Sequence, residues 1–203
     1  MNKQSDVFLI LNGEEPNHLP DLTSYSLICA TDGAIHFLEK KGITPDLLSG
    51  DFDSSSHQPK DIEVLHTPDQ NFTDFEKMLS ILHERGYASI DIYGASGKEQ
   101  DHFLGNLHTA LIWKDRIDLR FFDNHGTYFF CSKEIEIKDI LGKTISLFPF
   151  PEAKNISTTG LQYPLKKESL SFHQRIGTRN KAIEENVHIQ FTEGDLIVFV
   201  NHN

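Results

Sequence analysis

The sequence predicts two folds in one chain, a Rossmann-like α/β domain with a mainly parallel sheet and an all-β sandwich domain. Up to about residue 123, short apolar runs alternate with amphipathic segments, which is typical of a parallel sheet covered by helices on both faces. After that point the helical periodicity disappears and only strand-like runs follow, which favours a sandwich or roll. We therefore expect an α/β domain over residues 1–124 and a β-sandwich domain over residues 125–203.

Apolar runs and amphipathic segments give the expected elements of the first domain. The expected strands are residues 7–11, 27–30, 47–49, 63–66, 89–93 and 118–122, and the expected helices are residues 34–41, 73–85 and 100–114. The second helix has the clearest limits, because Thr73 and Glu76 form a capping box and Gly86 gives a stop.

The second domain shows only strand-like runs. They are residues 127–130, 134–137, 144–148, 169–172, 187–191 and 196–200. The last two runs flank a turn-like segment, residues 192–195, which predicts a hairpin.

Composition excludes several classes of protein. The chain has 203 residues, of which 38% are hydrophobic and 24% charged, as in ordinary globular proteins. Its 19 basic and 30 acidic residues give a net charge of −11, which argues against nucleic acid or an anionic membrane as partner. No apolar stretch approaches a signal sequence or a membrane span, so we expect a cytoplasmic protein. The two cysteines, Cys29 and Cys131, lie in apolar runs and are expected to be buried thiols.

The segment from Gly50 to Ser54 reads Gly-Asp-Phe-Asp-Ser and directly follows an apolar strand. In an extended segment Asp51 and Asp53 point the same way, and two like charges so placed repel unless a cation lies between them. Paired carboxylates suit Mg²⁺, which completes its shell with water and substrate phosphates. The alternative interpretation is a solvated acidic turn.

A second polar cluster surrounds the start of the helix at residues 73–85. Gln70 and Thr73 precede it, and Asp74 and Lys77 lie three residues apart and share a face. Simple capping explains Asp74, whose charge favours the helix dipole. A lysine in the first turn opposes that dipole, so Lys77 fits better beside an anionic phosphate.

Two further clusters also lie where predicted strands turn into helices. Asp101 and Asn106 follow a glycine-containing turn, and Asp32 and Gly33 follow the second strand. Capped, partly polar helices would explain each of them alone. In an open α/β sheet, however, ligands bind beyond the carboxyl ends of the strands, where all these clusters are expected.

Taken in order, these segments resemble the thiamine pyrophosphokinase family. The matching segments are Thr31-Asp-Gly-Ala34, Pro45-Asp46 with Gly50-Asp-Phe-Asp-Ser54, Asp69-Gln-Asn-Phe-Thr-Asp-Phe-Glu-Lys77, and Gly94 to Gly97 with Asp101-His102 and Asn106. Thr158 to Leu165 extends the similarity into the second half. Ala34 departs from the family's second glycine in the first of these segments.

The resemblance implies the reaction ATP plus thiamine to AMP plus thiamine diphosphate, with Mg²⁺, in a homodimer with active sites between subunits. It implies that the second domain binds thiamine and forms the dimer. It assigns metal binding and catalysis to Asp51, Asp53 and Asp74, and further catalytic roles to Lys77 and Asp101. The residues that it implies for binding ATP or its phosphates are Asp32, Gly33, Asp51, Thr73, Lys77 and Asn106. Those that it implies for binding thiamine are Gln70, Thr178 and Asn180.

Two other functions remain open at this stage. A Mg²⁺-dependent phosphohydrolase would use the same carboxylates with water as acceptor. A non-catalytic nucleotide or thiamine sensor would bind without turnover. The chemistry itself fits a pyrophosphoryl transfer, because Mg²⁺ and a lysine can neutralise phosphate charge and a nearby carboxylate, Asp101 by preference, can accept the hydroxyl proton.

Overall fold

The structure, a computed structural model, describes residues 5–50 and 62–202. The described chain is a mixed, sheet-rich fold with helices only in its first part. It divides into two compact units, an N-terminal unit that ends at Asn124 and a C-terminal unit that begins at His125. Each unit is described by itself.

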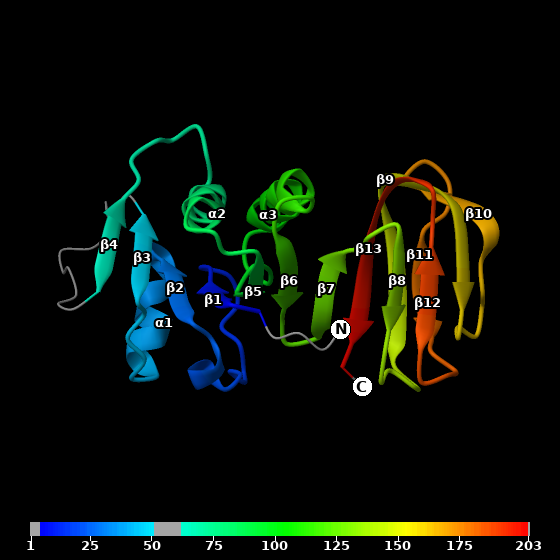
Figure 1. Cartoon of the computed structure of the whole chain (residues 1–203), viewed down its shortest axis with the longest axis horizontal. Helices are drawn as coiled ribbons and strands as arrows, with labels where there is room; N and C mark the ends of the chain where they lie inside the picture. The colour runs from blue at the N-terminus through cyan, green and yellow to red at the C-terminus, as the bar shows by residue number, and fades with distance from the viewer. Residues whose placement is uncertain (1–4, 51–61, 203) are drawn as a thin grey trace. The chain divides into compact units, whose positions relative to one another are not determined.

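Six parallel strands form the sheet of the N-terminal unit (Figure 1). Their bounds are β1 Val7–Ile10, β2 Leu27–Thr31, β3 Leu47–Gly50, β4 Glu63–His66, β5 Ser89–Tyr93 and β6 Asp118–Phe122. Their order is β4-β3-β2-β1-β5-β6, and every neighbouring pair is parallel. The order reverses between β1 and β5, which creates a topological switch point.

Helices cover both faces of this sheet. Helix α1, Ile35–Lys40, buries Phe37 and Leu38 in a cluster with Phe8 of β1. On the opposite face, Phe75 of α2, Asp74–Glu84, meets Phe121 of β6 edge to face at 6.0 Å. Helix α3, Gln100–Trp113, packs beside α2. Two short 3₁₀ turns, Leu22–Ser24 and Asp32–Ala34, complete the helical elements.

The limits of α2 follow the capping signals in the sequence. The Thr73 hydroxyl accepts a hydrogen bond from the Glu76 backbone N–H at 3.2 Å, which satisfies one of the unpaired donors of the first turn. At the other end Gly86 adopts a φ of 85°, and its N–H donates to the His83 carbonyl. The helix expected at residues 73–85 is thus confirmed, with Thr73 as its N-cap and Arg85 as its C-cap.

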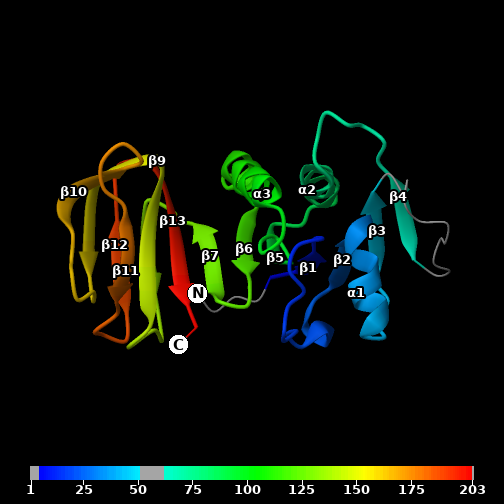
Figure 2. The same cartoon turned by 180° about the vertical axis from the view of Figure 1, so that it is seen from behind.

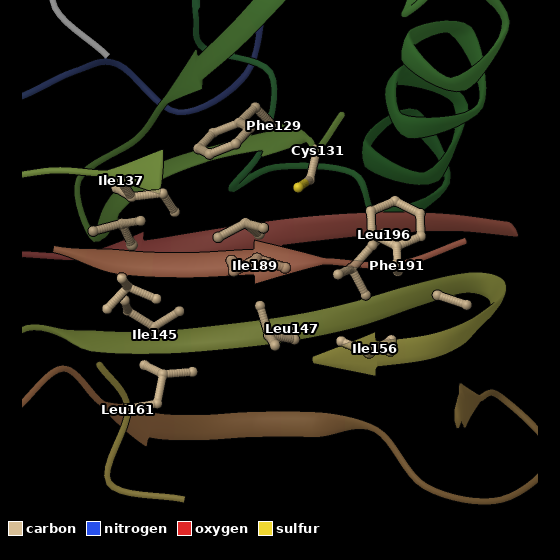
Figure 3. Close-up of a cluster of buried hydrophobic side chains, with 14 of the residues drawn as sticks. Phe129, Cys131, Ile137, Ile145, Leu147, Ile156, Leu161, Ile189, Phe191 and Leu196 are labelled. Atoms are coloured by element: carbon tan, nitrogen blue, oxygen red, sulfur yellow. The ribbon is translucent and has the colours of Figure 1, made fainter. Parts of the chain in front are cut away.

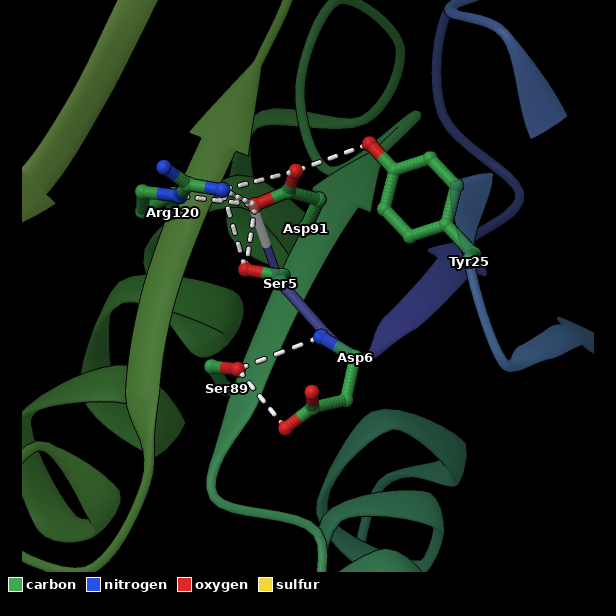
Figure 4. Close-up of polar contacts among 6 residues, drawn as sticks. All are labelled: Ser5, Asp6, Tyr25, Ser89, Asp91 and Arg120. Carbon is green, nitrogen blue, oxygen red and sulfur yellow. Dashed lines mark hydrogen bonds and ion pairs between the residues drawn. The ribbon is translucent and has the colours of Figure 1, made fainter. Parts of the chain in front are cut away.

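A buried polar network joins four segments of the N-terminal unit (Figure 4). The Asp91 carboxylate on β5 accepts hydrogen bonds from Ser5 at 2.8 Å and Tyr25 at 2.8 Å, and from the Arg120 Nε on β6 at 2.8 Å. Burial, and then the hydrogen bond to Asp91, raise the pKa of Tyr25 well above its ordinary value, so this phenol stays protonated and donates. The network ties the segments before β1 and β2 to the centre of the sheet.

Antiparallel strands form the C-terminal unit. Their bounds are β7 Gly126–Phe130, β8 Glu134–Ile137, β9 Thr144–Thr159, β10 Lys166–Ser171, β11 Gly177–Lys181, β12 Val187–Gln190 and β13 Glu193–Asn201. The order is β7-β13-β9-β12-β8, with β10 and β11 also paired to β9. The long strand β9 is therefore the centre of the unit, since four other strands pair with it.

One apolar core fills the C-terminal unit (Figure 3). Alternate residues of β9, Ile145 and Leu147, point into it and are at most 2% exposed. Ile189 of β12 and Leu196 of β13 complete the packing around them. This period-two pattern is the signal that predicted strands here.

One prediction for this unit is wrong, one expected strand is longer than predicted, and one strand was missed. Strands β12 and β13 do not form a hairpin, because they pair on opposite sides of β9. The run expected at residues 144–148 continues to Thr159, through two prolines that normally end a strand. Strand β11 was not expected at all, because its sequence, Gly-Thr-Arg-Asn-Lys, contains no apolar residue.

Both cysteines are free thiols in buried positions, as expected. Burial raises the pKa of the Cys131 thiol to about 12 and that of Cys29 higher still, so neither forms a thiolate readily. Over residues 5–50 and 62–202, the structure has no helix of the length and apolar character needed to cross a membrane.

Candidate active site

Polar residues of the N-terminal unit gather at the carboxyl edge of its parallel sheet. The segments that follow β1, β2 and β5 lie next to one another there, because these three strands are neighbours around the switch point. A cavity of about 440 Å³ opens between these segments and the first turns of α2 and α3. Figures 1 and 2 show the elements that form it from two sides.

The cavity brings together every predicted site residue of the first domain that the structure describes. These residues, which come from the ends of β2, from α2 with the segment before it, and from α3, are Asp32, Gly33, Gln70, Thr73, Asp74, Lys77, Asp101 and Asn106. Asp51 and Asp53 lie outside the described residues. Asn12, Phe72, Ser96 and Lys98 also line the cavity and were not predicted.

The end of β3 lies against the Asp32 carboxylate. A Cβ atom on Gly50 would stand only 2.4 Å from the Asp32 Cγ and 2.6 Å from its Oδ2, so this position requires glycine. Asp32 also accepts a hydrogen bond from the Gly33 N–H at 2.6 Å. A carboxylate from the turn after β2 therefore borders the residue that precedes Asp51 in the sequence.

The first turn of α2 is connected to the same strand end through a chain of contacts. Lys77 Nζ pairs with Asp74 Oδ1 at 2.8 Å and donates to the Thr67 carbonyl at 2.7 Å. The Thr67 N–H in turn donates to the Gly50 carbonyl at 2.9 Å. This chain of contacts links Asp74 to Gly50. Asp32 thus borders the end of β3 directly, and Asp74 is connected to it through Lys77 and Thr67.

Helix α3 contributes its first two turns to the cavity. The Asp101 carboxylate accepts a hydrogen bond from the His102 N–H at 3.0 Å, within the first turn, and the side chain remains exposed. One turn further on, the Asn106 amide donates to the Ala95 carbonyl at 2.9 Å. Asn106 therefore fixes the loop after β5 to the helix as well as lining the cavity.

The two predicted thiamine contacts of the second domain, Thr178 and Asn180, lie on β11 of the C-terminal unit. The Asn180 amide bonds to both the N–H and the carbonyl of Tyr163, at 3.1 and 2.7 Å. These contacts hold the turn before β10 against β11, so Asn180 has a structural role in the chain. Thr178 is exposed to solvent.

The residues that sequence reasoning missed had a recognisable signal. Asn12 and Gly13 lie one residue beyond the end of β1, much as Asp32 and Gly33 follow β2, and both strands were predicted. Lys98 follows the glycine turn after β5, three residues before Asp101. Its ammonium donates to the Asn12 Oδ1 at 3.1 Å, so the two missed residues contact one another.

Comparison with known proteins decides the family. Residues 21–121 match the family described as the thiamin pyrophosphokinase catalytic domain, and residues 132–196 match its vitamin B1 binding domain. The thiamine pyrophosphokinase of Bacillus subtilis is 31% identical over 207 residues, which cover 93% of this chain and 95% of that protein. This chain belongs to the thiamine pyrophosphokinase family.

Solved structures of the family share the fold. The crystal structure of the Bacillus subtilis thiamine pyrophosphokinase superimposes with a TM-score of 0.83 at 27% identity, covering 97% of this chain and 99% of that one. Yeast thiamin pyrophosphokinase reaches a TM-score of 0.84 at 15% identity, covering 98% and 87% of the two chains, which shows the fold alone. The predicted family is confirmed, the chain is an enzyme of this kind, and neither the phosphohydrolase nor the sensor alternative finds support.

Proposed function

We propose that this chain transfers the pyrophosphoryl group of ATP to the hydroxyl of thiamine in the cavity of its N-terminal unit. The observation that carries the proposal is the convergence of residues from three separate segments, all predicted from sequence, on one cavity. It holds both anionic and cationic side chains, which suits a charged nucleotide and its charged acceptor.

The transfer requires one bond to form and one to break. The thiamine hydroxyl oxygen bonds to the β-phosphorus, and the bond from that phosphorus to the oxygen bridging to the α-phosphorus breaks, so AMP leaves. The hydroxyl proton passes to a base, for which we propose the exposed Asp101 carboxylate. We further propose that Lys77, Thr73, Gly33, Asp32 and Asn106 hold the phosphates and that Gln70 contacts thiamine.

The donor set fits Mg²⁺. Carboxylate oxygens are the ligands this ion prefers; Asp32 borders the glycine that precedes Asp51 in the sequence, and Asp74 is linked to that glycine through Lys77 and Thr67. No group of three potential ligands occurs among the described residues, so the proposed set of Asp51, Asp53 and Asp74 relies on two residues outside them. When bound, the ion would neutralise phosphate charge.

We also propose that the Rossmann-like domain and the sandwich domain have different roles. Residues 1–124 would bind ATP and Mg²⁺, which the all-parallel sheet and its switch point support. Residues 125–203 would contribute Thr178 and Asn180 to thiamine binding and form a homodimer. Large exposed apolar side chains in this unit support an interface: Leu141, Tyr163, Phe172 and Ile183. Light scattering of the purified protein tests the dimer.

The decisive experiment measures products with and without the acceptor. The full chain is incubated with Mg-ATP, with and without thiamine, and AMP and thiamine diphosphate are quantified. We expect both products in equal amounts and only when thiamine is present. Release of AMP at the same rate without thiamine would show that water is the acceptor and would overturn the proposal.

A further inference from the structure

The side chain of Asn12 bridges two of the loops that line the cavity. Residue 12 lies between two backbone contacts that continue the pairing of β1 with β5: the Leu11 N–H donates to Tyr93 at 2.9 Å, and the Gly13 N–H to Gly94 at 2.6 Å. The backbone of Asn12 is therefore held on both sides. Its side chain accepts a hydrogen bond from Lys98 Nζ, which comes from the loop after β5.

On its other side Asn12 occupies the space that a side chain at residue 33 would need. A Cβ atom on Gly33 would stand 2.5 Å from the Asn12 Nδ2, 2.7 Å from its Cγ and 3.0 Å from its Cβ. Real Cβ atoms do not approach heavy atoms so closely, so one of the two residues would have to move. Gly33 does not need glycine for its backbone conformation, since it has no positive φ.

These contacts explain why residue 33 is glycine without requiring a phosphate to approach it closely. We propose that Asn12 is a positioning residue that holds the Lys98 ammonium against the nucleotide phosphates, and that Gly33 is glycine to make room for it. The inference rests on the proposed function, because it names two more residues of the same ATP site. The ligand group is a polyphosphate, for which a lysine is a suitable point charge.

The environment of Lys98 supports a role in holding an anion. It lines the same cavity as Lys77, whose ammonium is already engaged by Asp74 and the Thr67 carbonyl. Lys98 is exposed and has a neutral acceptor in Asn12, so its positive charge is not cancelled by that contact. An exposed lysine held by one neutral hydrogen bond keeps donors for a ligand, since an ammonium has three.

A double-mutant cycle tests whether Asn12 acts through Lys98. Asn12→Ala and Lys98→Ala should each lower kcat/KM for ATP by about tenfold, the value of one hydrogen bond to a charged group. The double variant should be little worse than either single variant, and KM for thiamine should not change. Additive losses, or losses equal for both substrates, would show that Asn12 does not act by positioning Lys98.

A second cycle tests the reason for Gly33. Gly33→Ala should lower kcat/KM for ATP in the wild-type background but cost little further in the Asn12→Gly background, where the space is already open. An equal cost in both backgrounds would mean that the phosphate itself needs the room at Gly33, and would overturn the inference. Melting curves exclude unfolding. Wild-type activity that depends on thiamine keeps a failure here distinct from a failure of the proposed function.

Discussion

The two units of this chain differ in how far neighbouring residues determine their structure. In the N-terminal unit the bounds of β4, β5 and β6 agree with the sequence pattern to the residue. In the C-terminal unit the pairing of β12 and β13 was wrong and β11 was missed. Three of the parallel strands, β2, β4 and β5, are each followed by a turn and a helix, so their signals are local. Antiparallel pairing around β9 depends on residues far away in the sequence.

The same difference appears in how the units are held together. The N-terminal unit contains a buried ion pair between Asp91 and Arg120, whose side chains are 4% and 14% exposed. The main described cluster of the C-terminal unit consists of apolar side chains. The carboxyl edge of the N-terminal unit also carries the charged cavity. We therefore expect function and polar specificity to be concentrated in the first unit and apolar stability in the second.

The largest effect should be on turnover, from a substitution in the cavity of the N-terminal unit. Asp74→Asn should lower kcat by at least about 100-fold, because it removes the charge proposed to hold the metal and the partner of Lys77. The control is Glu76→Gln in the same helical turn, since Glu76 does not line the cavity and should keep near-normal turnover. Equal activity in the two variants would mean that Asp74 is only a helix-capping residue.

The buried ion pair should give the next largest effect, on stability. Arg120→Met leaves the Asp91 carboxylate buried without its cation and should cost about 3–5 kcal/mol in the free energy of unfolding by urea. Arg85→Met is the matched control. Arg85 makes an equally bidentate pair with Glu63, but at the surface, where such pairs contribute about 0–1 kcal/mol. Similar losses in both variants would contradict the distinction.

A substitution that leaves a cavity in the apolar core tests how much this core stabilises the second unit. Leu147→Ala removes a side chain that is 2% exposed and should destabilise the protein by about 2–5 kcal/mol. Ile176→Ala, at 38% exposure in the same unit and outside the proposed interface, should change stability by no more than about 0.5 kcal/mol. Denaturation monitored by circular dichroism compares the two. In the folded fraction of each variant, KM for ATP should be unchanged, because ATP is proposed to bind the other unit.

Particular residues show how much of the candidate site could be predicted from the sequence. Asp32, Asp74 and Asp101 could be placed at one edge because each follows a predicted strand or begins a predicted helix, and parallel strands end together. Asn12 and Lys98 were missed because an exposed asparagine and lysine in loops look like ordinary surface residues. The contact between Asn12 and Gly33 joins the ends of different strands, so only the three-dimensional structure reveals it.

The smallest effects separate structural from binding roles on β11. Asn180→Ala removes two hydrogen bonds to Tyr163 and should lower stability by about 1–2 kcal/mol. Thr178→Val keeps the shape of an exposed side chain and should leave the melting temperature unchanged, while raising KM for thiamine about threefold if one neutral hydrogen bond is lost. An unchanged KM for thiamine in both variants would remove β11 from the thiamine site. Thiamine would then have to contact other residues, and the stability measured for Asn180→Ala would define a purely structural role for this strand.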